Sequence, residues 1–357
     1  MRSLIFGLLL SLAVPVLSTA GAQGAYPSTT RTYRVKQTAT VSEIPAGSKD
    51  VKFWVSIPDN DRHQDVLNID VAKAPGPWKV VRDLDRGNRF LLVEVANPTT
   101  PSLDVVVEFT VTRRSTQIAV DAAKVGALSA GQKTIFAPEL VLDAPHMTAS
   151  ADVRAMADKA CGDEKNLATQ AKALLNAVAA YADHYSKDPT KPKCGIGDAG
   201  DCMTNKGGCC TDLHSLFIAM ARYRGIPSRL QMGYRCLEKN DGKEVDPGYR
   251  CWAEYFLPGY GWVPADIVEA DAEGGLGPTV WFTGLTERRV WLNEGREFGL
   301  ADRKAPARVN TMIIGYCEID GVPARVLPDG DKAAQLTRKV FFTEVKPDAV
   351  SATGTGK

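Results

Sequence analysis

The chain contains 357 residues, of which 44% are hydrophobic and 24% are charged, and its formal net charge is +1. This length and apolar content are sufficient for two domains with a buried core. A net charge so close to zero creates no global electrostatic field toward nucleic acid or an anionic membrane. We therefore expect neither of them as a partner.

The first 22 residues have the layout of a cleavable secretory signal. Arg2 precedes the apolar run from Leu4 to Val14, and the small residues Ala20-Gly21-Ala22 follow. The run is too short to span a bilayer comfortably. We therefore expect a periplasmic or secreted protein with no membrane attachment after cleavage. Because these compartments are oxidising, the eight cysteines are expected to include disulfides.

Residues 30–117 are predicted to form an antiparallel β-sandwich. Strand-forming residues alternate with polar ones, and Gly, Pro, Asn and Asp separate the runs. The alternating runs are residues 33–41, 51–57, 90–95 and 103–111. The segment contains no catalytic constellation, and we interpret His63 as a solvated loop residue.

Two helices are predicted after a connector of residues 118–147. The first begins near Ser150, and the second extends to about Tyr185. His184 lies near the end of the second helix, where we interpret it as a solvated or dipole-stabilised histidine. Residues 186–209 are poor in apolar residues and form a long loop, which in compact domains tends to be functional.

A glycine-rich turn ends this loop and leads directly into a patterned helix. Cys210 is expected in the first turn of that helix, where free N–H groups and the helix dipole favour a thiolate. The thiol is then a nucleophile, or else Cys210 is a half-cystine or a small core residue. His214 follows one turn later on the same side. The helix ends at Gly225-Ile226-Pro227.

Residues 249–266 are predicted to form two short strands joined by a Pro-Gly turn. The first strand carries Arg250-Cys251-Trp252, and the second ends at Asp266. Side chains alternate between the faces of a strand, so Arg250 and Trp252 are expected on one face and Cys251 on the other.

Together, these stretches resemble the transglutaminase-like superfamily. Its bacterial members carry G-N-C-T-D-F-H-S-L-F, then H-C-W-A-E-F-Y, then G-W-V-P-V-D, and the resemblance extends from about Thr30 to Gly321. It implies an α+β fold in which residues 148–325 form a papain-like core, with the cysteine helix packed on an antiparallel sheet, preceded by the β-sandwich. It also implies a Cys-His-Asp triad in which Cys210 is the nucleophile and Asp266 the orienting acid.

Arg250 occupies the position of the family's histidine. Its guanidinium can stabilise a thiolate and pair with Asp266, but a group with a pKa above about 12 cannot give a proton to a leaving amine. One reading is a thiol acyl-transfer scaffold that hydrolyses or transamidates protein or peptide substrates without an efficient proton shuttle. The alternative is a non-catalytic module that binds protein or peptide. A third reading has His146 or His214 as a substitute base, although packing or hydrogen bonding is the expected role of His214.

The state of the cysteines decides between these readings. We predict that Cys210 is a free thiol of low pKa that faces Arg250, and a Cys209–Cys210 disulfide would contradict this. Cys236–Cys251 and Cys194–Cys202 are the candidate disulfides. The sequence suggests no metal, nucleotide or other cofactor. Residues 346–357, rich in Ser, Thr and Gly, are expected to be a disordered tail.

Overall fold

The structure is a computed structural model that describes residues 26–193, 195–245, 249–272, 275–326 and 332–346. The predicted secretory signal, Cys194 and the predicted tail after Lys346 lie outside these described residues. Within them, no helix combines the length and the apolar character needed to cross a membrane.

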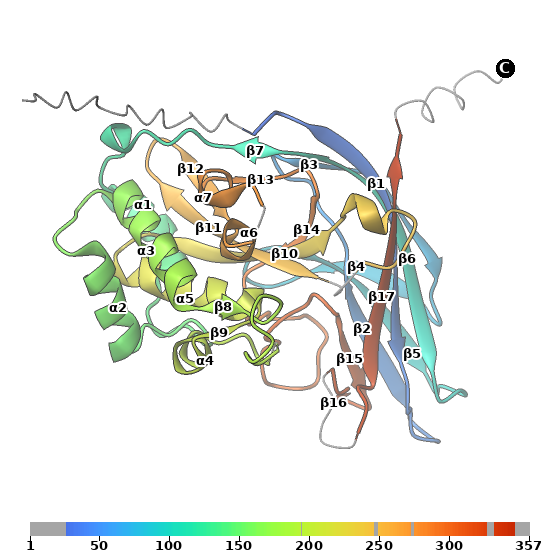
Figure 1. Cartoon of the computed structure of the whole chain (residues 1–357). Coiled ribbons are helices and arrows are strands. Elements are labelled where there is room, and N and C mark those ends of the chain that lie inside the picture. Colours follow the sequence, from blue (N-terminus) through green and yellow to red (C-terminus); the bar gives the residue numbers. More distant parts are fainter. Residues whose placement is uncertain (1–25, 194, 246–248, 273–274, 327–331, 347–357) are drawn as a thin grey trace, which may run out of the picture.

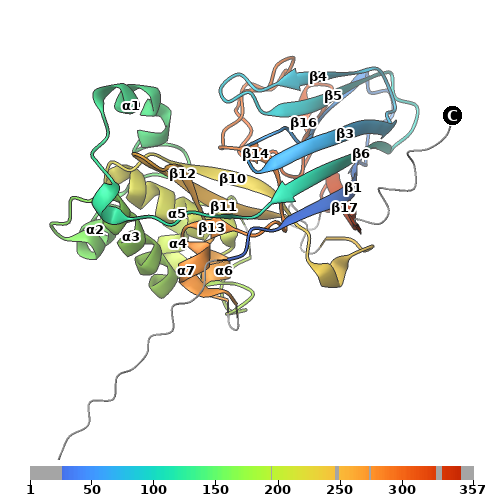
Figure 2. The ribbon, with the colours of Figure 1, turned by 90° about the horizontal axis from the view of Figure 1, so that it is seen from above.

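Two antiparallel sheets pack face to face at one end of the molecule (Figures 1 and 2). The first sheet has the order β17 (Leu336–Val345), β1 (Thr30–Val41), β6 (Leu103–Arg114) and β3 (Gln64–Lys73). The second has the order β16 (Val322–Pro323), β15 (Tyr316–Ile319), β2 (Asp50–Ser56), β5 (Arg89–Ala96) and β4 (Trp78–Arg82).

Alternation of apolar and polar side chains explains how these sheets pack. In β1, Tyr33 and Val35 are buried while Arg34 and Lys36 are exposed, as expected for a strand with one solvent-exposed face. The second sheet is buried on both faces around Trp54, because Trp54 also packs in a small separate core that includes Phe298. The antiparallel β-structure predicted from residues 30–117 is confirmed.

Strands from the far end of the chain complete both sheets. β17 pairs with β1 from Thr32↔Val345 to Val41↔Leu336, and β15 pairs with β2. This pairing differs from the sequence-based prediction, in which residues 316–325 belong to the core domain and residues 336–345 form no strand. The strands β7 (Thr116–Gln117) and β13 (Gly284–Leu285) pair to form a separate two-stranded sheet where the chain leaves the sandwich.

The other half of the molecule packs helices on a four-stranded antiparallel sheet. Its strand order is β12 (Gly261–Ala265), β11 (Arg250–Leu257), β10 (Ser228–Arg235) and β14 (Arg289–Glu294). The remaining elements are α1 (Ala130–Ile135), α2 (Ala151–Cys161), α3 (Leu167–Tyr181), β8 (Asp183–His184), α4 (Ala199–Asn205), β9 (Gly207–Gly208), α5 (Cys210–Tyr223), α6 (Ile267–Ala270) and α7 (Gly277–Trp281), together with the 3-10 helices Ala122–Lys124, Ala137–Leu140 and Glu238–Asn240. Figure 1 shows the sheet between these helices and the sandwich.

Helix α5 is the centre of this half. Every residue from Cys210 to Arg222 is buried, since α2, α3, α4 and the sheet surround it. Its start is held by Asp212, whose carboxylate accepts hydrogen bonds from the backbone N–H groups of Cys209 (2.8 Å) and Asp198 (2.9 Å). The predicted arrangement of a cysteine-bearing helix on an antiparallel sheet is confirmed.

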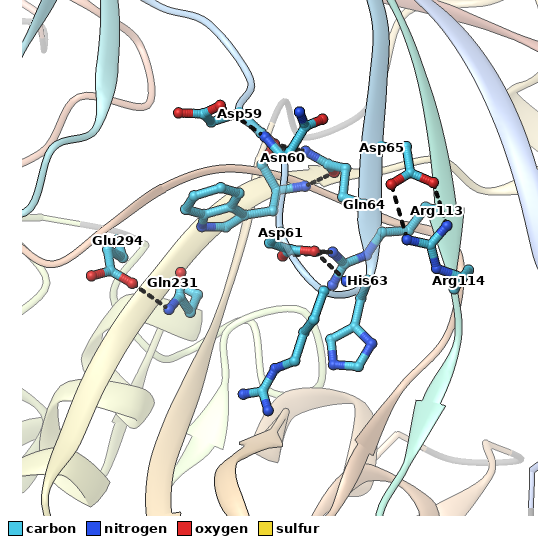
Figure 3. A network of polar contacts seen from close by, with 12 residues as sticks. Asp59, Asn60, Asp61, His63, Gln64, Asp65, Arg113, Arg114, Gln231 and Glu294 are labelled. Carbon is cyan, nitrogen blue, oxygen red and sulfur yellow. Dashed lines mark hydrogen bonds and ion pairs between the residues drawn. The ribbon is translucent and has the colours of Figure 1, made fainter.

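A network of polar contacts ties the sandwich to the opposite face of this sheet (Figure 3). The Gln64 side chain donates to Trp291 O and accepts from Trp291 N, each at 2.9 Å, and Arg113 pairs with Asp61 at 3.0 Å. His63 in this network is half-buried rather than solvated. Burial and the nearby Arg113 lower its pKa to about 4.

Candidate active site

Cys210 is the first residue of α5, and its side chain is only 3% exposed. It is a free thiol, as predicted. A hydrogen bond from the Cys251 thiol lowers its pKa well below the usual range, against the effect of burial, and a hydrogen bond with His184 and the charge of Arg250 act in the same direction. The sulfur therefore has the character of a thiolate.

The other cysteines correct two sequence-based predictions. Cys209 is disulfide-bonded, but Cys210 is free, so the two are not joined to each other. Cys236 and Cys251 are both free thiols, because Cys251 pairs across the sheet with Met232 and lies away from Cys236. Cys202 is also free, which rules out the Cys194–Cys202 disulfide.

Strand β11 presents Cys251, not Arg250, to the nucleophile. The Cys251 sulfur lies 3.4 Å from His214 Nδ1 and 3.6 Å from Thr211 Oγ1. Trp252 lines a cleft on the opposite face of the sheet with Arg229 and Trp262. The predicted alternation is present, but the prediction that Arg250 faces Cys210 directly is wrong.

Arg250 influences the site through its charge. Its side chain is 7% exposed, and Nη1 donates to the carbonyl of Tyr249 at 3.1 Å. It has no ion pair with Asp266 among the residues that the structure describes, so the predicted Arg250–Asp266 pair is wrong.

Asp266 pairs instead with Arg289. Oδ2 lies 2.9 Å from Arg289 Nη2, which also contacts Glu269 at 2.9 Å, and Oδ1 caps the short helix α6. Burial alone would raise the pKa of Asp266, but the charge and hydrogen bond of Arg289, together with the backbone N–H of Glu269, outweigh it, so the carboxylate stays ionised. Asp266 and Arg289 are each only 1% exposed.

His214 holds its proton away from the nucleophile's sulfur. The backbone N–H of Ile267 donates to Nε2 at 3.1 Å, so the neutral ring carries its proton on Nδ1, which lies 2.6 Å from the carbonyl oxygen of Cys210. Burial lowers the pKa of His214 and favours this neutral form. These contacts agree with the predicted hydrogen-bonding role.

His184 is the residue of this site that sequence reasoning missed. Helix α3 ends at Tyr181, and His184 follows in β8, which pairs in parallel with β9 so that His184 lies opposite Gly208. Its side chain is buried, so of the predicted solvated or dipole-stabilised roles the solvated one is wrong, and its hydrogen bonding lowers the pKa of Cys210. No local spacing could have shown this, because the contact depends on pairing across the intervening loop.

His146, the other substitute base considered from the sequence, lies elsewhere. It pairs with Asp198 at 3.5 Å and with Glu297 at 3.2 Å. In the described part of the chain, no group of three or more His, Cys, Asp or Glu residues is arranged to hold a metal ion.

A cavity of about 400 Å³ lies beside the start of α5. Thr211, the neighbour of Cys210, and Tyr249 line it, and their hydroxyl oxygens are 3.3 Å apart. The remaining wall is mostly apolar and includes Ile196, Ile313, Ile314, Tyr316, Ala324 and Val326. The cavity is large enough for one or two side chains of a peptide.

Comparisons with known proteins agree with this architecture. Residues 154–267 match the model of the transglutaminase-like superfamily. A protein of Haemophilus influenzae described as uncharacterized is 25% identical over 352 residues, covering 87% of this chain and 94% of that protein. The crystal structure of a "Putative Cysteine Protease" from Cytophaga hutchinsonii has a TM-score of 0.57 at 16% identity, covering 90% of this chain and 94% of that chain.

These findings define the fold of the protein. It is an α+β fold, in which a transglutaminase core of helices and antiparallel sheet follows N-terminal antiparallel β-sheets. The fold class predicted from the sequence is confirmed.

Proposed function

We propose that this protein is a thiol-dependent acyl-transfer enzyme that acts on carboxamide or peptide bonds through Cys210. The observation that carries the proposal is a free thiol at the start of a buried helix whose pKa is lowered well below its usual range and which contacts a histidine. Because a thiolate is the reactive form, this combination is what a nucleophilic cysteine requires.

The chemistry divides into two steps. The Cys210 thiolate attacks the carbonyl carbon, and the resulting oxyanion can be stabilised by backbone N–H groups in the first turn of α5. Collapse of this intermediate leaves a thioester on Cys210 and expels an amine, which must receive a proton. Water or a primary amine then attacks the thioester, which gives hydrolysis or transamidation respectively.

The substrate class follows from the apolar cavity next to Thr211. Its wall suits a protein or peptide segment with an apolar side chain beside the reactive carbonyl. The secretory layout of residues 1–22 supports a periplasmic or secreted location as part of the same proposal.

A second candidate is a non-catalytic module that binds protein or peptide. Two observations favour it: Cys210 is only 3% exposed, and Arg250 stands where a histidine would complete the family's triad. A substrate would need to displace part of the surrounding wall before it reached the sulfur.

The deciding experiment combines an activated ester with mass mapping. The protein is mixed with a p-nitrophenyl ester, and we expect a burst of nitrophenol together with an acyl group on Cys210. Cys210→Ala should abolish both. Cys161→Ala is the matched control, because burial raises the pKa of that thiol and it should leave the burst intact. Absence of a burst and of any acyl adduct in the wild-type protein would favour the binding module.

A further inference from the structure

We propose that His184, oriented by Ser186, is the acid–base group of Cys210 and replaces the histidine absent from position 250. This inference rests on the proposed function and names the proton carrier that its mechanism needs. It assigns a catalytic role to a residue outside the strand pair that resembles the family motif.

Backbone pairing brings His184 to the nucleophile. Asp183 and His184 run parallel to Gly207 and Gly208, and Tyr185 N donates to Gly208 O at 2.8 Å. The close approach requires glycine, because a Cβ at Gly207 would lie 2.4 Å from the carbonyl oxygen of Asp183. His184 is thus attached to the turn that immediately precedes Cys210, and is held there by the backbone.

Ser186 determines how the imidazole is oriented. The backbone N–H of Ser186 donates to Nδ1 at 3.2 Å, and the hydroxyl oxygen of Ser186 lies 2.7 Å from the same nitrogen. Nδ1 is thus engaged by Ser186, either as an acceptor or, when it carries a proton, as a donor to the hydroxyl oxygen, and Nε2 is the nitrogen left for Cys210. When the ring is protonated, Nδ1–H can donate to the Ser186 hydroxyl. Ser186 is accordingly a positioning residue.

The charged and titratable neighbours agree with this assignment. Those close to the Cys210–His184 pair are Asp212 and His214 on α5, Tyr249, and Arg250 and Cys251 on β11. Arg250 cannot release its proton, and the Nδ1 proton of His214 lies against the Cys210 carbonyl. Among the described residues, His184 is the histidine whose hydrogen bonding lowers the pKa of Cys210, and its backbone pairing with Gly208 places it beside that residue.

The proton balance of the reaction can then be written in full. The pair begins as thiolate and imidazolium, and the sulfur forms a bond to the carbonyl carbon. As the carbon–nitrogen bond breaks, the leaving amine takes the Nε2 proton, and a thioester and a neutral imidazole remain, whose proton on Nδ1 is donated to the Ser186 hydroxyl oxygen. The imidazole next removes a proton from the attacking water or amine, the carbon–sulfur bond breaks, and the thiolate and imidazolium are restored.

Two substrates with different leaving groups test this role. Nitrophenolate leaves an ester without a proton, whereas the amine of a peptide amide needs one. For His184→Gln we expect amide turnover to fall about 10²–10⁴-fold, the usual contribution of general acid–base transfer, while the ester burst at mildly alkaline pH falls less than about tenfold. Ser186→Ala should show the same selective loss to a smaller extent, and should shift the pH profile of amide turnover.

His63→Gln is the matched control, because it makes the same substitution at a histidine on the opposite face of the sheet. It should leave both activities unchanged. Unfolding curves identify any variant that has lost its fold, and a folded His184→Asn serves as the second variant. Equal losses on ester and amide would overturn the role of His184 alone. A wild-type protein without a burst would overturn the proposed function itself.

Discussion

The two sides of the nucleophile differ in how they use polar groups. On the strand side, Asp266, Arg289 and Glu269 are closed into ion pairs. On the loop side, His184 has one nitrogen bound to Ser186 and the other available to Cys210. The position of a residue in a sequence motif therefore does not by itself define its chemical role. The carboxylate matched to the family's triad is paired with Arg289 here, and we assign the proton transfer to His184 on the loop side.

Burial explains why the strand side is closed. Removing charges from water costs several kcal/mol per ion, and pairing plus hydrogen bonding must offset that cost. Asp266 meets both requirements through Arg289 and the N–H of Glu269. Its Oδ1 also lies 3.8 Å from His214 Nε2, but that nitrogen accepts a hydrogen bond from Ile267 N and so does not donate to the carboxylate.

The largest expected effect comes from breaking the strand side. Arg289→Ala should lower the free energy of unfolding by about 3–5 kcal/mol, because it leaves the buried carboxylate of Asp266 without its arginine partner, while Glu269 keeps its ion pair with Arg235. Urea unfolding measures this change in the free energy of unfolding. The control is Lys73→Ala, which removes an ion pair with Asp104 in which both side chains are more than a third exposed, and should cost less than about 1 kcal/mol. Equal effects would show that the buried cluster contributes little.

Asp266→Asn separates stability from catalysis. We expect a loss of about 2–4 kcal/mol in unfolding free energy, because Arg289 loses a charged partner. The pH profile for amide turnover should keep its shape, since Ser186 and not Asp266 orients His184 in our proposal. A variant that kept its stability but changed this profile would restore Asp266 as the orienting acid.

Cys251 and Arg250 allow a graded test of the thiolate. Both lower the pKa of Cys210, and the Cys251 hydrogen bond has the larger effect. Removing either raises that pKa, so the thiolate fraction at mildly acidic pH falls by about tenfold for each pKa unit. Rates of iodoacetamide alkylation against pH should therefore decrease in the order wild type, Arg250→Gln, Cys251→Ala. The reverse order would contradict the contacts of β11.

The smallest effect concerns the opposite face of the sheet, which touches neither side of the site. The folded pKa of His63 is about 4, below its unfolded value, so the unfolded state takes up the proton first as the pH falls. The contribution of His63 to the free energy of unfolding is complete above pH about 6.5 and is lost on acidification toward pH 4. Allowing for partial exposure, wild type should lose about 1–2 kcal/mol more than His63→Gln across this window. If the curves of unfolding free energy against pH ran parallel for wild type and His63→Gln, the stabilising contribution of His63 would be ruled out.

The sequence by itself determined the features that depend on near neighbours. Period-two alternation predicted the strands, as in the buried Tyr33 and Val35 of β1. The glycine turn and the helix start placed Cys210 at the first position of α5. These features could be predicted because propensity, capping and side-chain periodicity act over a few residues.

Only the tertiary structure decided which distant groups meet. β17 pairs with β1 from the opposite end of the chain, Asp266 meets Arg289 instead of Arg250, and His184 reaches Cys210 through the pairing of β8 with β9. Each contact depends on which segments share a buried face once long loops close. That choice is set by the sum of burial and backbone hydrogen bonding over the whole fold, which local pattern does not encode.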